Sequence, residues 1–195
     1  MSLQNKAQIR KNILAIRNNL PESEKLHLQN LIAKNFDKLI TPIIMKKTII
    51  ATYYPVGSEL DILPMLLDKL STKLSLPVMK SSTKILEFCS WKISDKLSHS
   101  KYAKNILEPE VKSAEVIPDV VIAPLIACDI HGHRIGSGRG MYDATIAHLR
   151  AYNPNLLYVG ICYDFQLLKH IPAEEHDQKL DIILTESRMI QLERA

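Results

Sequence analysis

The sequence contains few glycine, cysteine and aromatic residues. Of its 195 residues, only 6 are glycine and 3 are cysteine, and 6% are aromatic. The cysteines, Cys89, Cys128 and Cys162, are odd in number, lie far apart and each falls in an apolar stretch. We therefore expect buried thiols in a reducing compartment rather than a disulfide or a metal site.

Long apolar runs are also missing. No segment approaches the roughly 20 apolar residues that a membrane-spanning helix needs. The first twenty residues carry a polar or charged side chain every two or three positions, so they lack the apolar centre of a secretory signal. We expect a cytoplasmic protein with no membrane partner.

Neither sign of charge dominates the chain. Lys and Arg number 25 against 21 Asp and Glu, which gives a net charge of +4. The basic residues are scattered, and no basic stripe is interleaved with aromatic side chains. This balance suits an anionic small molecule and argues against a nucleic-acid partner. We expect a monomer whose substrates are small molecules.

Helical periodicity is clearest in the first forty residues. Residues 6–20 place apolar side chains at helical spacing before Pro21, and a second helix with its own apolar stripe follows Pro21. The expected stripes are Ile9, Ile13, Ile16 and Leu20, then Leu28, Leu31, Ile32, Phe36 and Leu39. Two further helices are predicted at residues 61–73 and 141–152.

Short strands are predicted between and after these helices. They fall at residues 48–54, 74–79, 85–91, 119–128, 156–163 and 181–186. The continuous apolar run at 119–128 is typical of a strand that is buried on both faces of a parallel sheet. The polar stretch at 92–118 is predicted to be a long functional loop.

This order of elements predicts an α/β fold. We expect one domain over residues 1–195, a three-layer, Rossmann-like sandwich whose mostly parallel sheet has helices on both faces. Ligands of such folds bind beyond the carboxyl ends of the strands.

Half of the glycines lie in one segment, RIGSGRGMYD at residues 134–143. A loop of this kind, between a strand and a helix, can bring its backbone N–H groups close to an anion. Arg134 and Arg139 can add charge-assisted hydrogen bonds to phosphate oxygens. The spacing matches neither the dinucleotide fingerprint nor the P-loop. HGHRIGSG could also be a plain hairpin, so the loop alone leaves both interpretations open.

Carboxylates follow the glycine loop in two places. Asp143 directly after the loop and Asp177 in IPAEEHDQKLD could hold Mg²⁺, which binds through one or two carboxylates together with substrate phosphates. Asp143 could equally be an ordinary first-turn residue that the helix dipole favours. Most of the later acidic residues should form a solvated loop face.

Several segments together resemble the 5-formyltetrahydrofolate cyclo-ligase family. That family carries K-x-x-x-R near its N-terminus, E-x-D after the first strand, R-x-G-x-G-x-G-Y-Y-D and a late acidic segment. Here they read KAQIR at 6–10, SELD at 58–61, RIGSGRGMYD at 134–143 and EEHDQKLD at 174–181. One departure matters, because Met141 replaces the first tyrosine of the family's pair and any contact that needs its hydroxyl is lost.

The resemblance implies an ATP- and Mg²⁺-dependent cyclisation of 5-formyltetrahydrofolate to 5,10-methenyltetrahydrofolate, with release of ADP and phosphate. It implies ATP contacts from Lys6, Arg10, Arg134, Gly136, Ser137, Gly138, Arg139, Gly140, Met141 and Tyr142. It also implies catalytic roles for Arg139 and Tyr142, folate contacts from Tyr54, Glu59 and Tyr142, and Mg²⁺ ligation by Asp143 and Asp177.

Other interpretations of the same residues remain. Without the resemblance, Lys6 and Arg10 would be a solvated basic face. The chain could also be a different enzyme acting on a phosphorylated metabolite, or a non-catalytic folate- or nucleotide-binding module. The cyclo-ligase interpretation is favoured because the basic pair, the glycine loop and the two aspartates are all present in one chain.

Overall fold

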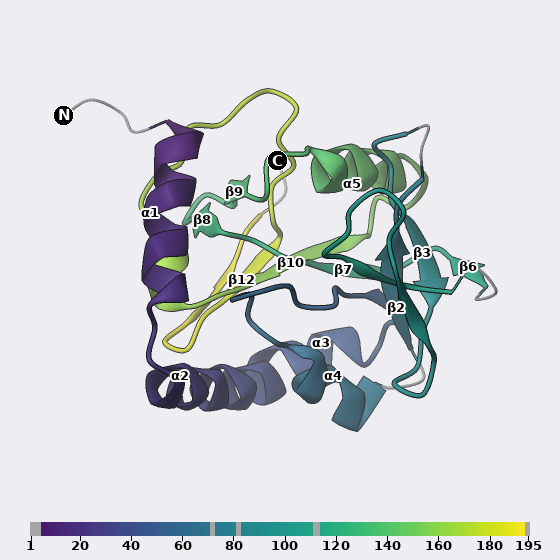
Figure 1. Ribbon diagram of the computed structural model, residues 1–195, viewed down its shortest axis with the longest axis horizontal. Coiled ribbons are helices and arrows are strands. Elements are labelled where there is room, and N and C mark those ends of the chain that lie inside the picture. Colours follow the sequence, from purple (N-terminus) through teal and green to yellow (C-terminus); the bar gives the residue numbers. More distant parts are fainter. Residues whose placement is uncertain (1–4, 71–72, 81–82, 111–113, 194–195) are drawn as a thin grey trace.

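The computed structural model describes residues 5–70, 73–80, 83–110 and 114–193. Within these residues the strands of the main sheet follow the order β13-β12-β10-β7-β1-β2-β3-β6 (Figure 1). These strands are β1 (Ile50–Ala51), β2 (Leu74–Val78), β3 (Glu87–Ser90), β6 (Glu115–Val116), β7 (Val120–Ala123), β10 (Leu157–Ile161), β12 (Ile182–Leu184) and β13 (Met189–Gln191). The five from β12 to β2 are parallel, and the outer strands pair antiparallel. The sheet is therefore mostly parallel, as predicted.

Helices cover both faces of this sheet, which confirms the three-layer prediction (Figure 1). On one face, α5 (Met141–Tyr152) packs Ile146 and Leu149 against the strands. The other face is covered by α2 (Glu22–Asn35), a π-helical segment η1 (Phe36–Ile40), α3 (Thr41–Ile44) and α4 (Leu63–Leu70). Residues 71 and 72 of the predicted third helix lie outside the described residues.

The second helix buries a stripe with a spacing of four residues, Ile32, Phe36, Ile40 and Ile44, whereas Leu28 and Leu39 are only partly buried. A stripe with this spacing drifts around a regular α-helix of 3.6 residues per turn. The wider π turn of η1 offsets that drift, because its hydrogen bonds run from i to i+5. The stripe consequently stays against the sheet.

Helix α1 (Lys6–Asn18) packs beside a second, smaller sheet rather than on the main one. That sheet has the order β11-β8-β9, with β8 (Ala127–Asp129), β9 (Arg134–Ile135) and β11 (Leu167–Leu168). Ile9 and Ile13 of α1 are buried as predicted. The prediction for Ile16 was wrong, because Ile16 is 50% exposed and the next residue, Arg17, is buried at 7% exposure.

Two strand predictions were also wrong in extent. The run 119–128 is not one strand, because the chain leaves the main sheet at Pro124 and β8 belongs to the smaller sheet. A proline has no N–H to donate to a sheet ladder, so the break follows from the residue itself. Of residues 48–54, only Ile50–Ala51 are in the sheet, and residues 52–54 continue beyond the carboxyl end of this central strand.

The stretch at 92–118 is more regular than predicted. It contains an antiparallel pair, β4 (Leu97–His99) and β5 (Leu107–Pro109), and the edge strand β6.

The three cysteines are buried free thiols, as predicted, and the sulfurs of Cys128 and Cys162 lie 3.7 Å apart. In the part of the chain that the structure describes, no helix has the length and apolar character needed to cross a membrane.

Candidate active site

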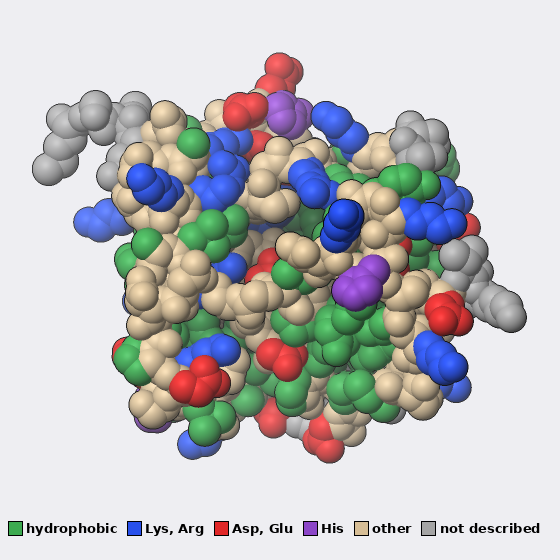
Figure 2. Space-filling model, in the orientation of Figure 1, with side chains coloured by type: hydrophobic (Ala, Val, Ile, Leu, Met, Phe, Trp, Pro, Cys, Tyr) green, Lys and Arg blue, Asp and Glu red, His purple; other side chains and the backbone are tan. Residues whose placement is uncertain are grey.

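A cavity of about 820 Å³ opens at the carboxyl ends of β1, β2 and β7. In sheet order, β2 lies on one side of β1 and β7 lies on the other, so the strand order reverses at this place. Such a switch point is where open α/β sheets bind ligands. Lys and Arg side chains lie on both sides of the hollow between α1 and α5 (Figure 2).

Every residue that the sequence assigned to a site lines this one cavity. They are Lys6, Arg10, Tyr54, Glu59, Arg134, Gly136, Ser137, Gly138, Arg139, Gly140, Met141, Tyr142, Asp143 and Asp177. Segments from both ends of the chain therefore meet at the same place. The cavity is large enough for a drug-sized ligand, whose pockets measure about 300–1,000 Å³.

The glycine loop connects β9 to α5 and has a backbone that other residues rarely adopt. Gly138 and Gly140 have φ angles of +94° and +67°, and Gly140 occupies the N-cap position of α5. At Gly136 a Cβ atom would lie 2.5 Å from a guanidinium nitrogen of Arg134. The hairpin that the sequence left open also exists, but it joins β8 to β9 and ends before the loop.

Replacing Gly138 by alanine tests whether this backbone holds the nucleotide. We expect Gly138→Ala to cost about 1–2 kcal/mol of stability, because L-residues are strained at positive φ. If the loop backbone holds the nucleotide, ATP binding measured by calorimetry should weaken at least tenfold, because relief of this strain would move the loop N–H groups; the added Cβ itself would only be in ordinary contact with the Arg10 guanidinium, at 3.5 Å. Gly57→Ala is the matched control, since its φ of +63° is similar but a Cβ there meets no atom within 4 Å. If both variants kept full ATP affinity, the loop backbone would not be the nucleotide site.

Arg134 is buried beneath the loop, with 8% exposure. Its Nη2 donates to Asp143 Oδ2 at 3.1 Å, its Nη1 donates to the Pro124 carbonyl at 3.4 Å, and its guanidinium lies 5.6 Å from the centre of the Tyr142 ring. Burial lowers its pKa, but Tyr158 and Asp143 favour the charged form and the pKa is raised overall. Arg134 thus anchors the loop as well as facing the cavity.

Two basic residues of α1 reach into the cavity. Lys6 Nζ donates to Asp177 Oδ2 at 2.6 Å and lies 3.0 Å from Glu174 Oε1, and Arg10 Nε donates to the Gly136 carbonyl at 2.8 Å. Burial lowers the pKa of Lys6, but its bonds to both carboxylates raise it overall. The same ion pair holds the pKa of Asp177 below its usual value despite burial. These contacts overturn the interpretation of Lys6 and Arg10 as a solvated face.

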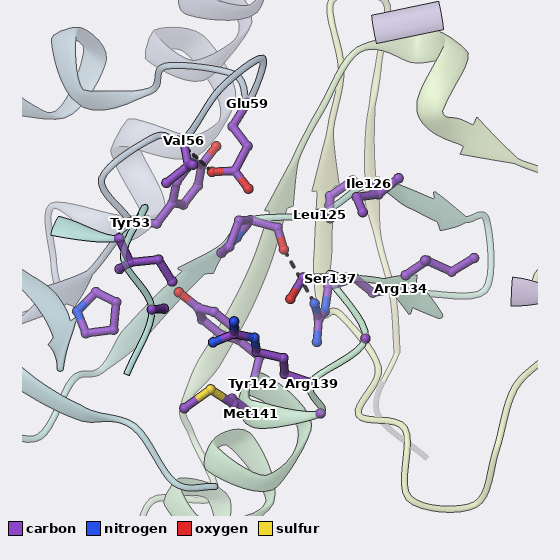
Figure 3. Close-up of a pocket in the computed structure, with 18 of the residues that line it drawn as sticks. Tyr53, Val56, Glu59, Leu125, Ile126, Arg134, Ser137, Arg139, Met141 and Tyr142 are labelled. Carbon is purple, nitrogen blue, oxygen red and sulfur yellow. Dashed lines mark hydrogen bonds between the residues drawn. The ribbon is translucent and has the colours of Figure 1, made fainter. Parts of the chain in front are cut away.

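The opposite wall carries Glu59 and two tyrosines (Figure 3). Glu59 Oε2 accepts a hydrogen bond from Val56 N at 2.9 Å, and burial raises the pKa of this carboxyl group. Tyr53 is buried and donates to the Leu60 carbonyl at 2.7 Å. Tyr54 packs edge-on against Trp91, with ring centres 6.5 Å apart. This wall offers one half-buried carboxylate among aromatic rings.

Arg139, Met141 and Tyr142 face Glu59 across the cavity (Figure 3). Arg139 is exposed, and its Nη1 lies 4.0 Å from the sulfur of Met79 at the end of β2. Burial raises the pKa of Tyr142 far above its ordinary value, so the phenol stays protonated at neutral pH. Tyr142 can therefore donate a hydrogen bond to a ligand, but it cannot act as a base.

Several cavity residues were missed by the sequence analysis. They include Arg17, Met79, Glu174 and the segment at 103–108. A signal existed for Arg17, because it follows Lys6 and Arg10 on the inner face of α1. Met79 and the 103–108 segment reach the cavity only through the strand pairing and had no local signal.

Comparison with known proteins gives the family. The model of the 5-formyltetrahydrofolate cyclo-ligase family matches residues 2–186. The chain belongs to this family. The 5-formyltetrahydrofolate cyclo-ligase of Escherichia coli K12 is 32% identical to this chain over 155 residues, which cover 76% of this chain and 82% of the relative. The Haemophilus influenzae cyclo-ligase is 28% identical over 191 residues, covering 94% and 99% of the two chains.

A solved structure agrees with the family assignment. The NMR structure of 5,10-methenyltetrahydrofolate synthetase from Aquifex aeolicus has a TM-score of 0.79 to this chain at 28% identity, covering 97% of this chain and 94% of the other. The α/β fold of this cyclo-ligase family member is thus shared along almost its whole length.

Proposed function

We propose that the chain, acting as one domain and as a monomer, catalyses the ATP- and Mg²⁺-dependent cyclisation of 5-formyltetrahydrofolate to 5,10-methenyltetrahydrofolate. The observation that carries the proposal is the set of residues that line the cavity described above. A glycine loop, basic side chains and two aspartates lie at one end, and Glu59 with aromatic rings lies at the other. Such a site can hold a nucleoside triphosphate and a pterin together.

The chemistry explains why both ends are needed. The formyl oxygen is a poor leaving group, so the γ-phosphoryl group of ATP is transferred to it and ADP is released. N10 of the folate then attacks the activated formyl carbon, N10 loses its proton, and the C–O bond breaks to release phosphate. Phosphoryl transfer depends mainly on positioning and charge stabilisation. We assign these roles to the loop N–H groups, Arg139 and Lys6, with Tyr142 donating a hydrogen bond.

The acidic residues fit a bound Mg²⁺. Asp143 and Asp177 line the same end of the cavity, and carboxylate oxygens are its preferred protein ligands. The described residues contain no group of three or more acidic, cysteine or histidine side chains placed for a metal. Two carboxylates completed by substrate phosphates are the usual arrangement for Mg²⁺ in nucleotide sites. When bound, Mg²⁺ would offset negative charge on the phosphates.

Asp177→Asn should raise the Mg²⁺ concentration needed for half-maximal rate by at least tenfold, with turnover partly restored by excess Mg²⁺. Glu174→Gln is the matched control, because Glu174 shares the Lys6 ion pair with Asp177 but is not assigned to the metal. Its Mg²⁺ dependence should match the wild type. Equal Mg²⁺ dependence in all three proteins would remove Asp177 from the metal site.

The proposed function is tested by ADP release from purified protein with Mg²⁺ and ATP, with and without 5-formyltetrahydrofolate. Methenyl product is followed by its absorbance in the same samples. We expect ADP release that depends on folate and matches product in amount. ADP release without folate would instead indicate another phosphate-handling enzyme, and binding without turnover would indicate a non-catalytic module.

A further inference from the structure

Arg17 is a buried cation that lines the cavity and has no role in the reaction proposed above. It lies in the last turn of α1 with 7% exposure, on the buried face that the predicted apolar stripe had assigned to its neighbour Ile16. A buried guanidinium is costly unless its N–H groups and its charge find partners. The partners that Arg17 has therefore indicate why the charge is placed there.

These partners come from two separate walls of the cavity. Arg17 Nε donates to Ser58 Oγ at 3.1 Å, in the turn directly before Glu59. Its Nη1 donates to the Leu125 carbonyl at 3.1 Å, just beyond the end of β7. Ser58 Oγ in turn donates to Asn18 Oδ1 at 2.5 Å, so the end of α1 holds this turn through two neighbouring side chains.

The charge of Arg17 also acts on the Glu59 carboxyl group. Burial raises the pKa of Glu59, while the Val56 N–H and the positive charge of Arg17 lower it. The phenols of Tyr53 and Tyr142 also interact with Glu59, and burial raises the pKa of both. Arg17 is consequently the cation that favours the ionised form of Glu59 at this wall.

We propose that Arg17 is a positioning residue of the folate subsite, which fixes the Glu59 turn against the end of β7 and keeps the carboxylate of Glu59 ready for the pterin. This inference rests on the proposed function, in which Glu59 accepts the pterin N–H donors. Lys6 and Arg10 serve the nucleotide end of the cavity from the same helix. Helix α1 thus places cations at both ends of the cavity.

The test compares Arg17→Met, which removes charge and donors, with Arg17→Lys, which keeps the charge. We expect Arg17→Met to weaken 5-formyltetrahydrofolate binding at least tenfold by calorimetry at pH 7.5, with the Kd for ATP changed less than twofold. The pH at which folate binding is lost on acidification should move upward in Arg17→Met and return toward the wild-type value in Arg17→Lys. Lys73→Met is the matched control, because Lys73 donates to two backbone carbonyls, those of Met45 and Lys47, and does not line the cavity.

A second measurement needs no ligand. The pKa of the Glu59 carboxyl group, followed by carbon NMR in the free protein, should rise in Arg17→Met and stay unchanged in Lys73→Met. An unchanged Glu59 pKa together with unchanged folate affinity would overturn the role of Arg17, as would equal losses for folate and ATP that follow a fall in Tm. Failure of the wild-type protein to bind folate would instead overturn the proposed function itself.

Discussion

Arg139→Ala should lower kcat by about 10²–10³-fold, the usual cost of removing a group that stabilises charge in the transition state. Arg139 is exposed on the glycine loop, and its bond to the Met79 sulfur is long at 4.0 Å, so Tm should change little. The Kd for 5-formyltetrahydrofolate should stay within about threefold, because Arg139 is assigned to the phosphates. Single-turnover kinetics with MgATP would measure the effect.

The control for Arg139→Ala is Lys101→Ala, which removes the same charge from an exposed position that does not line the cavity. It should keep wild-type kcat, because long-range effects of one surface charge are screened by salt. A comparable loss in Lys101→Ala would mean that net charge matters rather than the position of Arg139. Equal losses for ATP and folate in Arg139→Ala would contradict its separate role.

Glu59→Gln should weaken folate binding by about 10²-fold, because bonds to a charged acceptor are strong and an N–H donor left unpaired adds to the loss. A carboxylate can accept two parallel N–H donors from the 2-amino-4-oxo pterin ring, whereas an amide presents one acceptor and one donor. The Kd for ATP should remain near the wild-type value. Glu186→Gln is the matched control, since Glu186 is also partly buried, accepts a backbone N–H and has a pKa raised by burial outside the cavity.

The same residue gives folate binding a pH dependence with a defined sign. The pKa of Glu59 is raised by burial, so the carboxyl group takes up a proton at a higher pH than an exposed glutamate does. Protonation removes an acceptor, and wild-type affinity should therefore fall as the pH drops through this raised pKa. In Glu59→Gln the acidic fall should be absent. A fall of the same size in the variant would assign it to another group.

The sequence predicted best those elements whose ends are marked by local chemistry. Helix α5 runs over Met141–Tyr152 as predicted, between a glycine N-cap and the Asn153-Pro154 pair. The strand at 48–54 was overestimated, because β-branched and aromatic residues favour strands wherever they occur. Only tertiary pairing decides that Ile50–Ala51 stay in the sheet while Tyr53 and Tyr54 turn into the cavity.

The candidate site was predictable where residues form a motif and not where they depend on packing. The glycine loop, Asp143 and Asp177 could be placed from their spacing and from the family resemblance. Arg17 was assigned no role, because periodicity treats a charged residue near an apolar stripe as solvent-facing. The structure places it inside, while Ile16 faces solvent. The functional roles of all these residues remain predictions.

The docking of α1 also sets an order of assembly during synthesis. Ile9 and Ile13 pack against Ile126, Ala127, Ile135 and Ile171, more than 100 positions later in the chain. A helix of 13 residues is marginal in water without tertiary contacts, so the first helix to be translated must wait for its binding face. A nascent chain that ends before residue 171 therefore lacks part of this face, and the cavity closes only when translation is almost complete.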